Sequence, residues 1–312
     1  MKAIRIATRG SDLALTQARH IAARIEKELG CETELVVLRT TGDRIQDRSL
    51  AKIGGKGLFV KEIEEALLDG RADVAVHSAK DVPARIAEGC VLAAYPERVD
   101  PRDALAARER GTRLADLPPG AKVGTGSTRR VALLRAYRPD LELVPLRGNV
   151  PTRLARLDSD DLDAVVLACA GLDRLGLAER IDERISTDTM LPAVGQGFLA
   201  LETRADDEWH LRIRSLESPE LGMVARAERT FQAVLGGDCS IPMAGFAERS
   251  GNGELRFRAL VASLDGATIA RAEILGPETE APELGQRVAT ALLDSGGREI
   301  LHALAAETRS GD

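Results

Sequence analysis

The composition of this 312-residue chain is that of a folded protein with more than one domain. Hydrophobic residues make up 44% and charged residues 29%, a balance that excludes a disordered chain, and the length exceeds a single ordinary core. Aromatic residues make up only 3%, so the cores must be built mainly from Ala, Val, Leu and Ile. A net charge of −6, without a basic domain or stacking aromatic residues, argues against nucleic-acid binding.

The N-terminus and the cysteines indicate the compartment. The first residues, MKAIRIATRGSDLAL, lack the apolar region and cleavage site of a signal peptide, and no apolar run approaches membrane-spanning length. We therefore expect a cytoplasmic protein without a membrane partner. Cys31, Cys90, Cys169 and Cys239 are widely separated and show no CxxC spacing, which predicts free thiols rather than zinc ligands or disulfides. The dispersed histidines likewise predict no metal site.

The first third of the chain alternates strands and helices. KAIRIAT reads as a strand, and Ser11 is placed to cap a helix that Gly30 ends. TELVVLRTTGD and ADVAVHSAKDVP read as further strands, separated by a helix in GLFVKEIEEALLDG. This alternation predicts a parallel sheet covered by helices.

A second unit of the same kind occupies roughly 98–196. LPAVGQGFLALETR then predicts a crossing back, because Pro192, Gly195 and Gly197 interrupt regular structure. After it we expect a helix in ELGMVARAERTFQAVL, a strand pair in GELRFRALVASLDG and a helix in ELGQRVATALLDSGGREILHAL. The predicted fold is therefore α/β, with two α/β domains and a smaller C-terminal α+β domain.

Polar and basic residues recur where the predicted strands end, which is where open parallel sheets bind ligands. Helix N-termini bind anions, and arginine adds a bidentate fork for carboxylates or phosphates. Each residue alone has a structural explanation as a cap or an ion pair, but their recurrence predicts a cationic cleft for a polyanionic small ligand. The residues are Arg9, Ser11, Ser78, Lys80, Asp81, Thr125, Ser127, Arg129, Arg130, Arg147 and Asn149.

Asp81 is the one acid in this set, and it is a candidate for a catalytic role. Beside Lys80, its carboxylate could stabilise a positive centre or move a proton. The alternative is that Asp81 only caps the turn before Pro83.

Two further segments leave alternatives open. Lys52 and Lys56 flank a Gly-Gly turn in LAKIGGKGLF, which does not satisfy the P-loop pattern and reads as a solvated loop or as a lid. In the lid interpretation, Phe59 would pack on a flat ligand ring. Cys239, in LGGDCSIPMAG, is either a small buried hydrophobe or a thiol with a chemical role.

Six motifs occur in one order: RIATRGSDLAL, GGKGLFVKEIE, VHSAKDVP, LRGNVPTRLARL, LPAVGQG and GGDCSIP. Together they resemble the porphobilinogen deaminase, or hydroxymethylbilane synthase, family over essentially the whole chain. The resemblance implies two domains like the lobes of periplasmic binding proteins around a cleft, and a third domain that carries the cofactor cysteine. It implies these boundaries: domain 1 at 1–97 with 197–216, domain 2 at 98–196 and domain 3 at 217–312.

The resemblance also implies an activity. Members of this family are monomeric transferases of porphyrin and heme biosynthesis that join four porphobilinogen molecules head to tail, with loss of ammonia. The chain grows on a covalent dipyrromethane primer, and hydroxymethylbilane is released by hydrolysis. The alternative is a non-catalytic, two-lobed binding protein for a polyanionic metabolite. Such a protein would use the same arginines but would need neither Asp81 nor a thiol anchor at Cys239.

The resemblance assigns roles residue by residue. Asp81 matches the catalytic aspartate, and Cys239 matches the cysteine that holds the cofactor by a thioether. The implied cofactor ligands are Ser78, Lys80, Thr125, Ser127, Arg129 and Arg130. The implied substrate ligands are Arg9, Ser11, Arg147 and Arg153, with Arg174 acting in chain elongation. Lys52, Lys56 and Phe59 match the mobile loop.

Two positions depart from the family pattern. Gly126 stands where serine is common, which would remove one hydroxyl contact to the cofactor. Asp238 stands where glycine often precedes the cysteine, and a neighbouring carboxylate disfavours the thiolate, so it would slow cofactor attachment.

Overall fold

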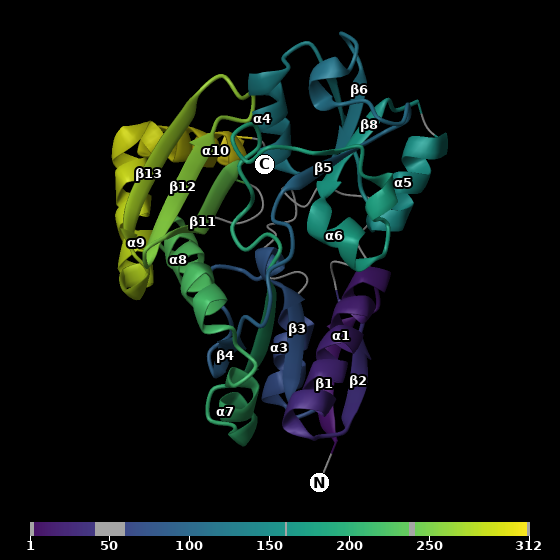
Figure 1. Ribbon diagram of the computed structural model, residues 1–312. Helices are drawn as coiled ribbons and strands as arrows, with labels where there is room; N and C mark the ends of the chain where they lie inside the picture. The colour runs from purple at the N-terminus through teal and green to yellow at the C-terminus, as the bar shows by residue number, and fades with distance from the viewer. Residues whose placement is uncertain (1–2, 41–59, 160, 237–240, 311–312) are drawn as a thin grey trace.

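The structure is a computed structural model that describes residues 3–40, 60–159, 161–236 and 241–310. Three β-sheets organise these residues, and each sheet is flanked by helices (Figure 1). The predicted α/β class, with a smaller C-terminal α+β part, is confirmed. Within the described residues, no helix is both long enough and apolar enough to span a membrane.

The first sheet has the strand order β2-β1-β3-β10-β4. As predicted, β1 pairs in parallel with β2 and β3. β10 runs antiparallel to β3 and β4, because it brings the chain back from the second sheet. The elements are β1 (Ile4–Arg9), α1 (Asp12–Leu29), β2 (Thr33–Leu38), α3 (Lys61–Leu68), β3 (Val74–Ser78), β4 (Cys90–Ala94), β10 (Leu199–Arg204) and α7 (Glu208–Arg214).

The predicted caps of α1 are present. Ser11 Oγ accepts a hydrogen bond from the amide of Ala14 (3.4 Å), and Gly30 ends the helix at φ +65°. Between these caps, Ile21 and Ile25 lie at helical spacing and are fully buried in a core with the strand residues Ile4 and Ile6. The periodic apolar face therefore fixes which side of the sheet this helix covers.

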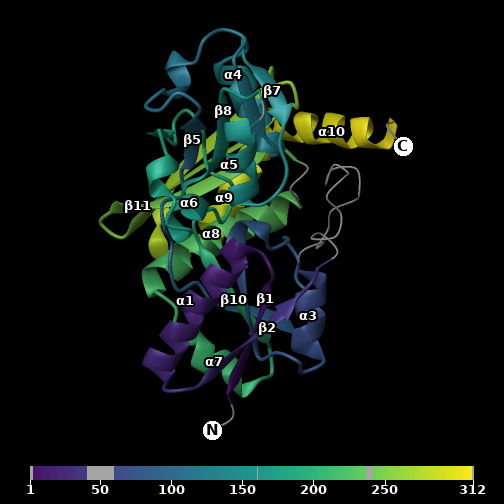
Figure 2. The same cartoon turned by 90° about the vertical axis from the view of Figure 1, so that its right-hand side faces the viewer.

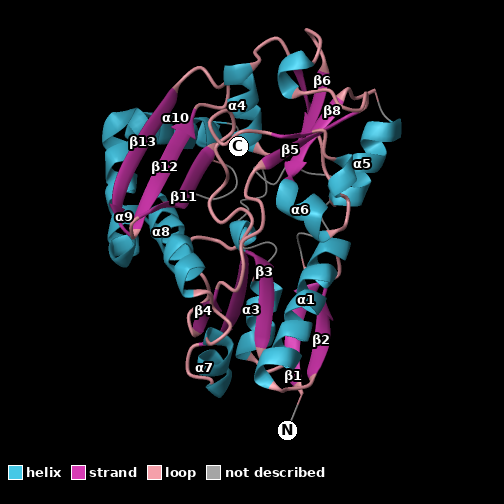
Figure 3. Ribbon diagram, in the orientation of Figure 1, coloured by secondary structure: helices cyan, strands magenta, loops and turns pink. Residues whose placement is uncertain are grey.

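The second sheet has the order β7-β6-β8-β5-β9. β6 pairs in parallel with β7 and β8, whereas β5 is antiparallel to β8. The chain thus crosses between the sheets twice, into the second on β5 and back into the first on β10 (Figure 3). The elements are β5 (Asp103–Ala107), β6 (Lys122–Thr125), α4 (Thr128–Tyr137), β7 (Glu142–Pro145), α5 (Val150–Ser159), β8 (Ala164–Ala168), α6 (Cys169–Arg174) and β9 (Glu183–Arg184).

The third sheet corrects two predictions. The expected strand pair within 253–266 is wrong, because this segment holds one strand that pairs with β11 and β13 on either side. The expected single helix over 283–304 breaks at Leu293–Gly297, where Gly296 adopts φ +101°, and α10 then extends away from the body (Figure 2). The elements are α8 (Pro219–Leu235), β11 (Met243–Gly251), β12 (Glu254–Ala262), β13 (Ile269–Pro277), α9 (Ala281–Leu292) and α10 (Arg298–Ser310).

Helices α8 and α9 pack unusually closely over this third sheet. A Cβ at Gly285 would lie 2.2 Å from the carbonyl oxygen of Ala227 and 3.2 Å from the amide nitrogen of Phe231. Phe231 in turn packs on Phe257, with their ring centroids 5.3 Å apart. Only glycine at residue 285 therefore allows the backbones of α8 and α9 to lie this close together.

We predict that Gly285→Ala lowers the free energy of unfolding by about 2 kcal/mol, because overpacking outweighs the better helix propensity of alanine. Urea denaturation would measure the change. Gln286→Ala is the matched control, since Gln286 is exposed on the same turn of α9. Equal midpoints for the two variants would contradict the packing argument.

Candidate active site

The ends of β1 and β3 form one wall of the candidate site. Arg9 is the last residue of β1, Ser11 caps α1, and Ser78 is the last residue of β3. Together with Gln17 and Asp81 they border a cavity of about 60 Å³. Gln17 Nε2 donates to Ser78 Oγ at 2.9 Å. The structure therefore brings four of the predicted residues together at the carboxyl ends of two parallel strands.

Asp81 is exposed at this edge of the sheet. It ends a 3-10 turn, Ala79–Asp81, that follows β3 directly. The turn is fixed by its backbone, because the amide of Ala79 donates to the carbonyl of Phe198 (3.1 Å) and that of Val82 to the carbonyl of Ala79 (3.2 Å). Within the described residues, the Asp81 carboxylate makes no hydrogen bond or ion pair, so it is not used as a cap and remains available.

Lys80 contributes a destabilised positive charge. Its Nζ lies 3.4 Å from Oε1 of Gln196, which belongs to the segment that returns from the second sheet. Burial, together with the nearby Arg130, lowers the pKa of Lys80 to about 8. Because the charged form is disfavoured at this place, an anion in contact with the ammonium group would be bound strongly.

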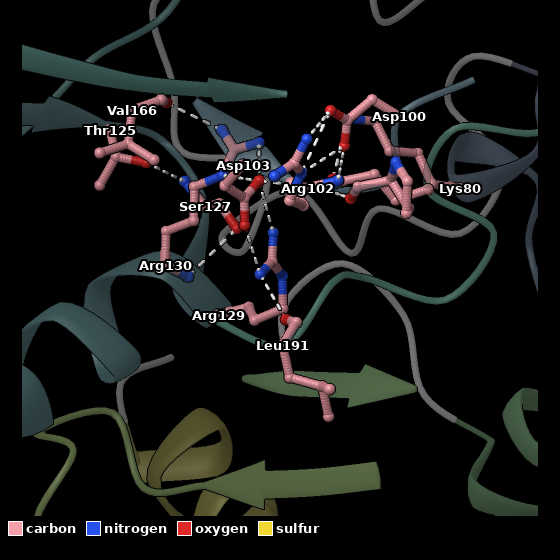
Figure 4. Close-up of polar contacts among 12 residues, drawn as sticks. Lys80, Asp100, Arg102, Asp103, Thr125, Ser127, Arg129, Arg130, Val166 and Leu191 are labelled. Atoms are coloured by element: carbon pink, nitrogen blue, oxygen red, sulfur yellow. Dashed lines mark hydrogen bonds and ion pairs between the residues drawn. The ribbon is translucent and has the colours of Figure 1, made fainter. Parts of the chain in front are cut away.

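Arg129 and Arg130, at the start of α4, converge on the buried carboxylate of Asp103 (Figure 4). Arg129 Nη1 lies 2.7 Å from Asp103 Oδ2, and Arg130 Nη2 lies 2.8 Å from Oδ1. Gln196 Nε2 also donates to Asp103 Oδ1 at 3.0 Å. Burial opposes ionisation of Asp103, but the two guanidinium groups hold its pKa well below the usual range. Two buried cations thus share a single anion.

The hydroxyl groups beside these arginines are engaged locally. Ser127 caps α4, and its Oγ accepts from the amide of Arg130 at 3.4 Å, as its position in the sequence predicted. Thr125 Oγ1 accepts from the amide of Ser127 at 3.4 Å. A hydroxyl group at residue 126 would not fit, because a Cβ there would lie 2.5 Å from the carbonyl oxygen of Leu146. The glycine at this departure from the family pattern is therefore a packing requirement of this chain.

Arg147 and Arg153 add further positive charge where β7 leads into α5. Arg153 Nε donates to the carbonyl of Gly148 at 2.8 Å. Burial, and then Arg130, lower the pKa of Arg153 to about 10, so its charge is also held at a cost. Arg147 is half-buried and makes no ion pair or hydrogen bond with the residues that the structure describes. Asn149 caps this helix as expected, accepting from the amide of Thr152 at 2.9 Å.

Arg174 has a different environment from the other predicted arginines. Its Nη2 donates to Glu97 Oε1 and to the carbonyl of Gly197, both at 2.9 Å. These partners lie on the segments that pass between the two sheets. Arg174 therefore binds the two segments that connect the sheets and is not part of the cluster around Asp103.

Four of the predicted residues lie outside the described residues: Lys52, Lys56, Phe59 and Cys239. The departure at Asp238 lies there too. The remaining cysteines are poor candidates for a reactive thiol. Burial raises the pKa of Cys90 and of Cys169 to about 12, and the Cys31 thiol is buried and donates to the carbonyl of Leu29.

Two residues of the site were missed in the sequence. Asp103 reads there as the first residue of an apolar strand, and Gln196 as part of a glycine-rich turn. In the structure, Gln196 contacts both Asp103 and Lys80 and so connects the two walls. A signal was present, since a carboxylate heading an otherwise apolar strand needs a partner, but the sequence does not say which arginine supplies it.

Comparison with known proteins identifies the family. The model of "Porphobilinogen deaminase, dipyromethane cofactor binding domain" matches residues 4–212, and that of "Porphobilinogen deaminase, C-terminal domain" matches residues 223–294. The chain belongs to the porphobilinogen deaminase family. The porphobilinogen deaminase of Syntrophus aciditrophicus is 50% identical over 306 residues, covering 96% of this chain and 98% of that one. The porphobilinogen deaminase of Chromobacterium violaceum is 48% identical over 311 residues, covering 99% and 100%.

The membership confirms the coarse functional predictions. The chain is a transferase of porphyrin biosynthesis, its predicted activity is that of porphobilinogen deaminase, or hydroxymethylbilane synthase, and its cofactor is dipyrromethane. The alternative of a non-catalytic binding protein is not favoured. Among solved structures, a periplasmic substrate-binding protein of an ABC transporter from Coxiella burnetii shares 16% identity at a TM-score of 0.43, covering 69% of this chain and 92% of that one.

The described residues fit the polyanionic cofactor of this porphobilinogen deaminase family member. Asp103 is the only carboxylate in ionic contact with Arg129 and Arg130 among the described residues, and Arg129 Nε is buried there without a hydrogen-bond partner. The charges of Lys80 and Arg153 are likewise weakly compensated. Cofactor carboxylates would supply the missing negative charge.

We predict that Lys80→Met stabilises the protein when the cofactor is absent. In a Cys239→Ser background, which removes the expected anchor, the gain should be about 2 kcal/mol at pH 7. The folded-state pKa of Lys80 lies below its ordinary value, so the cost of its charge is fully present below pH 8. It then fades as the pH rises toward 10.5. Thermal unfolding from pH 6 to 10 measures this, with the exposed Lys61→Met as control; destabilisation at pH 7 would refute it.

Proposed function

We propose that this chain joins four porphobilinogen molecules head to tail and releases hydroxymethylbilane. Four substrate molecules and one water would give one product and four molecules of ammonia. The observation that carries the proposal is the surplus of positive charge around Asp103, together with an exposed carboxylate at Asp81 that makes no hydrogen bond or ion pair with the described residues. A growing chain of pyrroles with acetate and propionate groups is a polyanion that matches such a site.

The basic residues would divide between two tasks. Ser78, Lys80, Thr125, Ser127, Arg129 and Arg130 would hold the carboxylates of the cofactor. Arg9, Ser11, Arg147 and Arg153 would hold those of the substrate. Arg147 supports this division, because it lies half-buried without an ion pair among the described residues. Arg174 would act in chain elongation. It is held by Glu97, which lies on a segment that passes between the two sheets.

Asp81 would be the catalytic residue. When porphobilinogen loses ammonia, positive charge develops on its pyrrole nitrogen, and a fixed carboxylate nearby stabilises that charge. Asp81 would also help to protonate the departing amine. When bound, the cofactor supplies a nucleophilic pyrrole carbon on which the product is assembled. Cys239 would hold it by a thioether, and Lys52, Lys56 and Phe59 would belong to a loop over the cleft.

The division into domains remains part of this proposal. Domain 1 would comprise 1–97 with 197–216, domain 2 would comprise 98–196, and domain 3 would comprise 217–312. The strand memberships support it, because β4 and β10 belong to the first sheet and β5 to the second. The expectations of a monomer, a cytoplasmic location and porphobilinogen as the small-molecule partner stay predictions.

Intact-protein mass spectrometry tests the cofactor assignment. We expect the purified chain to carry the added mass of two linked pyrrole units, and Cys239→Ser to lack it because no other thiol takes its place. Cys90→Ser is the control and should keep the added mass. An unmodified wild-type chain that consumes no porphobilinogen would refute the proposed function.

A second experiment tests the catalytic role of Asp81. Asp81→Ala should lower kcat by about 10²–10³-fold, since one contact to a developing charge is worth several kcal/mol. The melting temperature should change little, because the side chain is exposed and makes no hydrogen bond with the described residues, although its charge favours the charged forms of Lys80 and Arg153. Asp116→Ala, at another exposed carboxylate in a 3-10 turn, is the matched control. Near-normal turnover would remove Asp81 from the mechanism.

A further inference from the structure

Arg229 binds the backbone that follows Asp81. It belongs to α8, which lies between the third sheet and the first (Figure 1). Its Nη1 donates to the carbonyl of Val82 at 2.9 Å, and its Nη2 donates to those of Pro83 at 2.7 Å and Ala84 at 3.3 Å. One guanidinium group thus holds three consecutive carbonyls directly after the proposed catalytic residue.

No carboxylate pairs with Arg229 within the described residues. Its only side-chain partner there is the neutral Gln232, whose Oε1 accepts at 2.8 Å. Burial lowers the pKa of Arg229, so the fold holds this charge at a cost. By contrast, Arg226 on the same helix is exposed and paired with Glu217. A half-buried cation whose donors go to backbone carbonyls indicates that the position of that backbone matters.

Glu228, the residue before Arg229 in α8, holds a segment that packs on the other side of the turn Ala79–Asp81. Glu228 accepts from the amide of Gly195 at 2.7 Å and pairs with Arg98 at 3.0 Å. Gly195 packs directly on the turn, because a Cβ there would lie 3.0 Å from the backbone of both Ala79 and Lys80. Two consecutive side chains of one helix therefore clamp the turn Ala79–Asp81 before and after Asp81.

We infer that Arg229 is a positioning residue, which fixes the direction of the Asp81 carboxylate by holding the carbonyls of Val82, Pro83 and Ala84. This inference rests on the proposed function of Asp81. Loss of a residue that only stabilised the fold would disturb the sheets. Loss of the Arg229 contacts should instead misdirect the Asp81 side chain and leave the sheets in place. The same helix ends at Leu235, about 9 Å further along, immediately before the segment that contains Cys239. The helix therefore links the backbone that follows Asp81 to Leu235.

Steady-state kinetics of Arg229→Gln and Arg229→Lys test the inference. Misplacement by about 1 Å can cost 10²-fold, so we expect Arg229→Gln to lower kcat by about that factor with little change in KM. Arg229→Lys keeps the charge but has a single donor nitrogen in place of the guanidinium fork, so it should recover part of the loss. Arg226→Gln, on the same helix, should behave as the wild type. Unchanged kcat in Arg229→Gln would overturn the inference; if that variant does not fold, unchanged kcat in Arg229→Lys would.

A double-mutant cycle separates positioning from bracing. If Arg229 acts through Asp81, Arg229→Gln should hardly change the residual turnover of Asp81→Ala, because that carboxylate is already absent. The same fold-loss in both backgrounds would overturn the inference.

Hydrogen exchange gives a readout that does not depend on activity. In Arg229→Gln, the amides of 79–86 should exchange faster while peptides from the second sheet stay unchanged. Unchanged exchange in 79–86 would overturn the inference. A wild-type protein without turnover would refute the proposed function alone, and the exchange experiment would still test the clamp.

Discussion

Two buried arginines that share one carboxylate set the electrostatics of the cleft. Asp103 is fully buried and can compensate only one of the two charges on Arg129 and Arg130. Lys80 and Arg153 lie close enough for Arg130 to lower their pKa values further. This concentration of charge is unfavourable for the empty protein. Under the proposed function, a bound polyanion would make it favourable, so the fold would exchange stability for affinity.

The double crossing of the chain places this charge opposite Asp81. Because the chain enters the second sheet on β5 and returns to the first sheet on β10, the segment before β10 passes between the two sheets. Gln196, in that segment, contacts Asp103 on one side and Lys80 on the other. Helix α8 then holds the same region through Glu228 and Arg229. The proposed catalytic turn is thus supported from the third part of the chain, far away in sequence.

Where the sequence predictions failed, the reason is non-local. The third sheet was underpredicted because the strand Met243–Gly251 lacks a clean alternation and becomes a strand by pairing with β12. The break after α9 was missed because helical spacing was read through it, whereas the backbone of Ser295 and the left-handed Gly296 separate the two helices. The restriction to glycine at 126 comes from a carbonyl twenty residues later, which no local pattern reports.

The sequence by itself determined the local features: the caps at Ser11, Ser127 and Asn149, the parallel pairing of β1, β2 and β3, and the placement of basic residues at strand ends. The caps and the strand ends depend on neighbours within a few residues, and the parallel pairing follows from the alternation of strands and helices along the chain, so propensity and spacing are sufficient to predict them. Only the tertiary structure decided which charges are paired. Asp103 pairs with two arginines that lie 26 and 27 residues away, Glu97 pairs with Arg174, and Asp81 makes no hydrogen bond or ion pair within the described residues. Burial and distance set those pairings, and both arise only when the sheets pack together.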